Sequence, residues 1–165
     1  MGNPPSYPSS LNLSSETAAS AYKADLYRCV ISANEWGPFA GGSFETVVFD
    51  QLSQNSTGAG TPLDTGTGVF TIPKAGYWVI SSQCYLFTMN PSSLYQFTID
   101  VNGAQVAKSM ATADTTTHFF SAQIMANLAA NDLITITVKA AGSYNLTKID
   151  GNSVYSWFDL IHYPQ

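Results

Sequence analysis

The chain has 165 residues, of which 13% are aromatic and only 10% charged, and its net charge at pH 7 is −5. The aromatic content excludes a chain that is disordered throughout, and six cations without a basic cluster exclude the usual electrostatic binding of nucleic acid. No apolar stretch approaches the ~18 residues of a membrane-spanning helix, and residues 1–6 lack the cationic and apolar regions of a signal peptide. We therefore expect neither a nucleic-acid nor a membrane partner.

The first 24 residues differ in composition from the rest of the chain. Prolines and serines are concentrated there, and the few large side chains are too few to form a core. We expect residues 1–24 to form an extended arm that lies on a partner or on a neighbouring subunit. The arm residues predicted to contact that partner are Pro4, Pro5, Tyr7, Pro8, Leu11 and Leu13.

Residues 25–165 show the pattern of a single β domain. Apolar and polar residues alternate with a period of two in 94–101 and 133–138, which is typical of half-buried strands. Between 94–101 and the segment that starts at Ala104, Asn102-Gly103 is typical of a type I′ hairpin turn. Further strands are predicted at 26–32, 46–52, 68–72, 77–87, 118–125 and 154–163. Roughly eight to ten short strands without a long helix predict an all-β sandwich or jelly roll.

Two of the predicted strands, 77–87 and the last one, are apolar on both faces. In 77–87, Tyr77, Val79, Tyr85 and Phe87 alternate with Trp78, Ile80, Cys84 and Leu86. Because a large apolar face is not left in water, we expect one face to lie in the core and the other to join subunits. The alternative is that the arm folds back over this second face. The predicted subunit interface consists of Tyr77, Tyr85, Phe87, Trp157 and Tyr163.

The sequence offers no recognisable catalytic chemistry. It contains no nucleophile elbow, phosphate-binding loop, dinucleotide fingerprint or zinc-protease motif, and His118 and His162 lie in predicted strands. Its aspartates are scattered beside turns, where capping is the simpler role and a calcium site the alternative. Cys29 and Cys84 match no zinc or redox spacing, so we expect two buried thiols; a disulfide between them is the alternative. We predict no enzyme, no cofactor and no metal site.

Three loops are candidates for recognition, because connecting segments on a rigid scaffold often carry binding. Two of them, 53–67 and 114–117, are polar, and 35–39 is aromatic. Ordinary surface loops, with Trp36 packed as a plug, are the alternative. The candidate recognition residues are Trp36, Phe39, Asn55, Thr57, Thr115 and Thr116.

Several segments together carry a family resemblance. The stretch 68–80, GVFTIPKAGYWVI, resembles a signature of the jelly-roll superfamily that includes tumour necrosis factor and the globular heads of the first complement component. The segment at 47–50 resembles an early strand of that family, and those at 99–106, 128–136 and 153–161 resemble its later segments, ending with the terminal strand. All of them follow one another in the family's order, and the resemblance covers about residues 25–163. Asp159 departs from it, since the complement heads usually carry glycine there. The resemblance implies a ten-stranded jelly roll that forms a compact homotrimer, with aromatic strand faces at the three-fold axis.

Similar heads occur on bacterial spores and on bacteriophage particles, and the sequence begins with Met and shows neither a collagen-like stalk nor a membrane anchor. We therefore predict a trimeric decoration or cement protein on the exterior of a bacteriophage capsid, made in the host cytoplasm. Its partner would be the major capsid protein, bound through the arm and the base of the trimer. The alternatives are a receptor- or glycan-binding tip of a head spike or tail fibre, and a bacterial surface-coat module.

Overall fold

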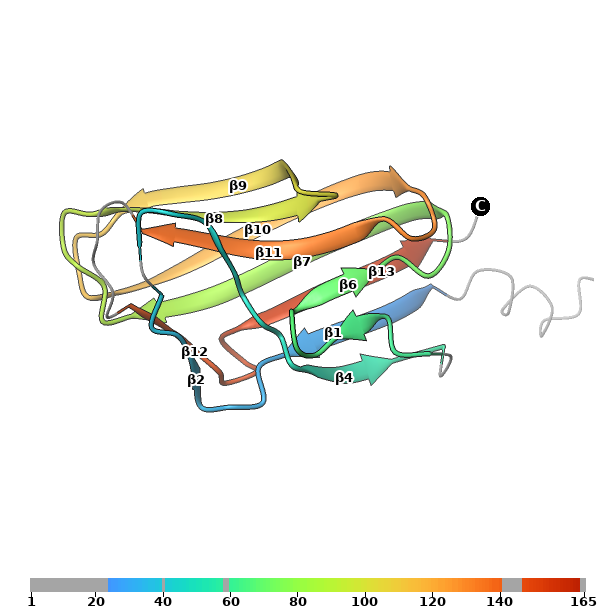
Figure 1. Ribbon diagram of the computed structural model, residues 1–165, viewed down its shortest axis with the longest axis horizontal. Helices are drawn as coiled ribbons and strands as arrows, with labels where there is room; N and C mark the ends of the chain where they lie inside the picture. Colours follow the sequence, from blue (N-terminus) through green and yellow to red (C-terminus); the bar gives the residue numbers. More distant parts are fainter. Residues whose placement is uncertain (1–23, 40, 58–59, 141–146, 164–165) are drawn as a thin grey trace, which may run out of the picture.

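Two antiparallel sheets form the molecule and pack face to face (Figure 1). The computed structural model describes residues 24–39, 41–57, 60–140 and 147–163. The expected arm residues between Pro4 and Leu13 lie outside these described residues. Across the described part of the chain there are thirteen strands and no helix, which confirms the all-β prediction. Three of the strands contain only two residues each, and the remaining ten equal the number expected from the family resemblance.

Sheet A has seven strands and is built around the twelve-residue strand β7 (Gly76–Phe87). The strand β10 (Thr117–Leu128) pairs with the whole length of β7 on one edge, from Leu128 opposite Gly76 to Thr117 opposite Phe87. On the other edge of β7 lie β13 (Trp157–Tyr163) and the short β12 (Lys148–Asp150). The sheet continues through β1 (Asp25–Val30) to β4 (Gln51–Asn55) beyond β13, and β2 (Glu35–Trp36) pairs with β12.

Sheet B has six strands, and its order is β5 (Leu63–Asp64), β6 (Val69–Thr71), β11 (Leu133–Ala140), β8 (Leu94–Val101) and β9 (Ala104–Thr112), with β3 (Glu45–Thr46) also on β11. The hairpin between β8 and β9 forms where the sequence predicts it. Asn102 and Gly103 have φ angles of 51° and 78°, which is the left-handed backbone that a type I′ turn requires. Asn102 also accepts from the Leu133 N–H and donates to Asp132, which ties this turn to the start of β11.

The core lies between the sheets and is rich in aromatic rings. Trp78, Tyr27, Phe70 and Phe158 are all buried, and the Tyr27 and Phe70 rings meet edge to face with centroids 5.3 Å apart. Such pairs add about 1 kcal/mol to the stabilisation from apolar burial. Cys84 and Cys29 are buried free thiols, so the expectation of two apolar-packed cysteines is confirmed. Burial raises the pKa of both thiols.

Two strand predictions were wrong in extent. The predicted strand 46–52 is interrupted at 47–50, because β3 pairs with β11 in sheet B whereas β4 pairs with β1 in sheet A. The segment between them therefore crosses from one sheet to the other, and it buries Val47 and Phe49 on the way. The last strand begins at Trp157 rather than at Val154, because the N–H groups of Tyr155 and Ser156 both donate to the carbonyl of Asn152 in a turn.

One polar strand face is buried rather than open to water. Thr98, Asp100 and Thr137 alternate with the core residues of β8 and β11, yet all three are less than a tenth exposed. The Thr98 hydroxyl donates to an Asp100 oxygen at 2.7 Å and lies 2.6 Å from the Thr137 hydroxyl. Mutual hydrogen bonding is what allows polar groups to lie out of contact with water.

Candidate functional site

The side of sheet A that faces away from sheet B carries the predicted subunit-interface residues. The alternation along β7 and β13 places all five on this surface, which we call the outer face of sheet A, while Trp78, Ile80 and Leu160 between them are buried in the core. Tyr77 and Tyr163 are 48% and 49% exposed and pair directly across the two strands. The five residues on the outer face are Tyr77, Tyr85, Phe87, Trp157 and Tyr163.

The strand β10 and the turn before β13 add apolar side chains that the interface prediction did not include. Phe119 and Met125 on β10 are 49% and 72% exposed on the same face. The rings of Tyr85, Phe119 and Tyr155 form a cluster with centroids 4.5 to 6.0 Å apart. Phe119 and Met125 could have been found from the alternation along their strand, which places them on the same face as Ser121 and Gln123. Tyr155 was missed because it lies in a turn, where the sequence pattern predicted a strand.

A polar row crosses this apolar face from β10 to β1. Gln123, Ser81, Asp159 and Arg28 are successive cross-strand partners on β10, β7, β13 and β1. Arg28 donates through Nε and Nη2 to the two carboxylate oxygens of Asp159, at 2.8 and 2.7 Å. This hydrogen bond to the Asp159 carboxylate raises the pKa of Arg28, and the guanidinium lies 5.2 Å from the centroid of the Trp157 ring. The outer face therefore consists of two apolar zones that a paired charge separates.

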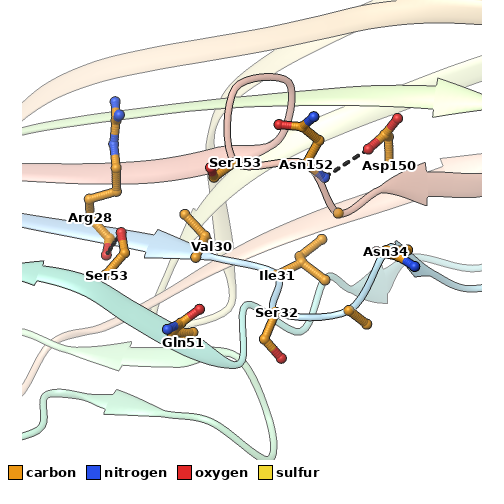
Figure 2. Close-up of a pocket in the computed structure, with 12 residues that line it drawn as sticks. Arg28, Val30, Ile31, Ser32, Asn34, Gln51, Ser53, Asp150, Asn152 and Ser153 are labelled. Atoms are coloured by element: carbon orange, nitrogen blue, oxygen red, sulfur yellow. Dashed lines mark hydrogen bonds between the residues drawn. The ribbon is translucent and has the colours of Figure 1, made fainter.

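A polar groove lies beside this face, between the ends of β1 and β4 and the turn at 150–153 (Figure 2). Its volume is about 700 Å³, which lies within the usual range of ligand sites. Amides, hydroxyls and one carboxylate line most of it, and Arg28 stands at one end. The polar residues of the groove are Arg28, Ser32, Asn34, Gln51, Ser53, Asp150, Asn152 and Ser153.

The wall of the groove is held by short-range hydrogen bonds and one very close backbone contact. Asp150 accepts from the Asn152 N–H at 2.7 Å, as Figure 2 shows, and the Gly151 N–H donates to the Asn34 carbonyl at 2.9 Å. A Cβ on Gly151 would lie 1.8 Å from the Ala33 carbonyl oxygen, so only glycine fits there. The turn at 150–152 was predicted from sequence, but its approach to 32–34 was not, because the two segments are far apart in the chain.

The six candidate recognition residues do not gather at one place. Asn55 and Thr57 lie beside the start of β1, where Tyr27 pairs with Asn55 and its hydroxyl is 3.3 Å from Thr57 Oγ1. Thr115 and Thr116 join β9 to β10 next to Phe87, at the opposite end of β7 from Gly76 (Figure 1).

The aromatic loop is packed rather than presented to solvent. The ring of Trp36 stacks on the ring of Phe39 with centroids 6.0 Å apart, and Phe39 is buried. The arrangement matches the plug that we weighed as the alternative for Trp36. Both residues therefore belong to the body of the domain.

The two histidines lie in β10 and β13, as predicted. His162 is buried, and its Nδ1 lies 3.3 Å from a carboxylate oxygen of Asp25, the first residue of β1. Its ring packs on Trp78 at 4.7 Å between centroids. Within the described ranges, no three His, Cys, Asp or Glu side chains are grouped as a metal would need, and no helix is long and apolar enough to cross a membrane.

The architecture is similar to that of known proteins, both in solved structures and in a family model. Crystal structures of murine APRIL at pH 5.0 and pH 8.5 each superpose with a TM-score of 0.61 at 13% identity, over 85% of this chain and 99% of that one. The pH 8.0 structure of the same protein gives 0.57 at 15% identity over the same shares. At this identity the likeness establishes the fold alone, a tumour-necrosis-factor-like jelly roll, and confirms the predicted fold class. No curated protein sequence matches the chain. Residues 32–159 match the C1q domain model, so the chain belongs to the C1q domain family.

Proposed function

We propose that this chain is a non-enzymatic structural protein that assembles as a homotrimer through the outer face of sheet A. The observation that carries the proposal is the set of large apolar side chains left exposed on one sheet face of the single chain. Apolar patches of this kind mark interaction sites in soluble proteins. C1q and tumour-necrosis-factor-like domains commonly form homotrimers, which makes two further copies of this chain the expected partners.

Sedimentation equilibrium of the full chain tests the assembly. We expect a mass three times the 17.7 kDa of the chain, unchanged over a tenfold range of concentration in the micromolar region. A mass of 17.7 kDa across that range would contradict the proposal.

The finer role that we propose is decoration of a bacteriophage capsid, with residues 1–24 attached to the shell protein. It is supported by the proline- and serine-rich arm, which has little to bury on its own, and by a surface poor in charge. A trimer suits the three-fold positions of an icosahedral shell. An extended segment can join shell subunits by burying area and pairing with strand edges.

A receptor-binding tip is the second candidate, and one placement favours it. The loop with Thr115 and Thr116 lies at the end of the domain away from the start of β1, so an attached arm would leave this loop pointing outward.

Quantitative mass spectrometry of purified particles from the source distinguishes the two roles. A copy number near a simple fraction of the shell protein is expected for decoration. A few copies per particle would favour the tip, and none would contradict both.

A further inference from the structure

We propose that the polar groove between β1, β4 and the 150–153 turn binds a neutral carbohydrate. This site is separate from the six loop residues considered for recognition, and it shares Arg28 with the polar row on the outer face of sheet A. The inference rests on the chemistry of the lining, on its fixed walls and on what the lining excludes.

The groove offers hydrogen-bonding groups that the protein itself leaves unused. Within the described ranges, the side chains of Asn34, Gln51 and Ser153 make no hydrogen bond to protein. Asn152 uses its Oδ1 to accept from the Val154 N–H, so its amide N–H groups are left for a ligand. Amides both donate and accept, hydroxyls do the same, and a carboxylate accepts at two oxygens. This mixture complements vicinal hydroxyl groups, each of which also donates and accepts.

The charges of the lining favour a ligand without net charge. Among the described residues that line the groove, Arg28 is the one cation, and its guanidinium already donates two hydrogen bonds to Asp159. Asp150 on the opposite wall is an acid that would repel a phosphate, sulfate or carboxylate. A phosphorylated or sialylated ligand would therefore find repulsion from Asp150 and a guanidinium that is already paired.

The apolar content is too small for a lipid or for the side chains of a peptide. Val30 and Ile31 are each 4% exposed, which leaves Ala33 as the apolar side chain open to the groove. Binding of an apolar ligand depends on the apolar area removed from water, and this groove has little to offer. Polar contacts must supply both the affinity and the selectivity.

The walls are fixed before any ligand arrives. The Ser32 N–H and hydroxyl both bond to Asp50 at 2.6 Å, and Ser53 donates to the Arg28 carbonyl at 3.2 Å. The opposite wall is held by Gly151 against Ala33 and by the Asp150–Asn152 bond. Because the backbone of both walls is held in this way, the entropy lost on binding is limited to the ordering of exposed side chains such as Asn34, Gln51 and Ser153.

A printed array of neutral and acidic oligosaccharides, probed with the full chain, tests the proposal. We expect binding to neutral glycans and none to sialylated or sulfated ones. Titration calorimetry with the strongest neutral oligosaccharide then compares three variants. Asp150→Asn retains an acceptor for the Asn152 N–H and should weaken binding roughly tenfold. Asn34→Ala should weaken it by a similar factor, and Gln51→Trp should abolish it by filling the groove.

Gln105→Trp is the matched control, since Gln105 is an exposed glutamine on an edge strand of sheet B. It should bind as the unmodified chain does. The proposal is overturned if the array shows no glycan binding, if acidic glycans bind best, or if Asp150→Asn and Asn34→Ala leave the affinity unchanged. Because those two changes are small, they decide the question even if Gln51→Trp fails to fold.

Discussion

Arg28 and Asp159 lie opposite each other on β1 and β13 and form a two-point ion pair within the polar row that divides the apolar outer face of sheet A. The Arg28 side chain remains 40% exposed in the single chain, so water still screens the pair. We expect Asp159→Ala to lower the free energy of unfolding by about 1 kcal/mol. Asp114→Ala, an exposed aspartate in a loop, should change it by less than about 0.5 kcal/mol. Denaturant titration at one fixed protein concentration measures both, and equal effects would contradict a stabilising pair.

The turn before β11 should make the fold sensitive to acid. Asp132 accepts from the Asn102 side chain at 2.9 Å and from the Ala129 N–H at 2.8 Å, and these bonds lower its pKa. Because the folded chain binds this proton less readily than the unfolded chain, the stabilisation is present above about pH 4 and lost as the pH falls further. Asp132→Asn should therefore flatten the fall in thermal midpoint between about pH 4 and pH 2.

The control for that change is Asp114→Asn, which also removes one carboxylate from an exposed loop, and the profile of Asp132→Asn should be the flatter of the two. An unchanged profile for Asp132→Asn would contradict the role of Asp132. Asp64 adds to the same trend, because the Gly66 N–H and Thr67 lower its pKa. Some acid sensitivity should thus remain in Asp132→Asn.

Glycine is required at positions 151 and 103 for two different reasons, a close backbone contact at Gly151 and a left-handed backbone conformation at Gly103. A Cβ at Gly151 would overlap the Ala33 carbonyl, whereas a Cβ at Gly103 would meet nothing within 4 Å although φ there is +78°. We expect Gly151→Ala to cost about 3 kcal/mol through displaced backbone, and Gly103→Ala about 1 kcal/mol through the left-handed conformation. Urea unfolding of the two variants gives the comparison. A smaller cost at Gly151 would show that the two groove walls can move apart freely.

Both cysteines should be inert in the folded protein. Cys29 and Cys84 are buried, and burial raises the pKa of each thiol, so the reactive thiolate is scarce. We expect a disulfide reagent at pH 8 to label neither thiol in the native chain and both in guanidinium chloride. Rapid labelling without denaturant would contradict the packing described for the core.

The elements that could be predicted were those fixed by local pattern. Alternation along 77–87 separated the core residue Trp78 from the outer-face residue Tyr85, and Asn102-Gly103 identified the hairpin. Strand 46–52 was predicted as one piece, since no local pattern indicates that the residues before and after 47–50 join different sheets.

The polar groove and the polar row depend on contacts between distant segments, which no local pattern encodes. Arg28 meets Asp159 across 131 positions of sequence, and Gly151 meets Ala33 through the packing of two turns. The outer face was predicted in part, because alternation identifies which residues share a face but not how much of that face stays exposed. Phe119 and Met125 were therefore missed although their strand was predicted.

The most direct test of the central claim, that the outer face of sheet A joins three copies, is a pair of methionine substitutions. Met125 on this face is 72% exposed and Met110 on sheet B is 53% exposed, so neither change should disturb the core. By light scattering after size-exclusion chromatography, we expect Met110→Lys and the unmodified chain to have three times the chain mass and Met125→Lys to be monomeric. A trimer that survives Met125→Lys, or an unmodified chain that is monomeric, would contradict the account.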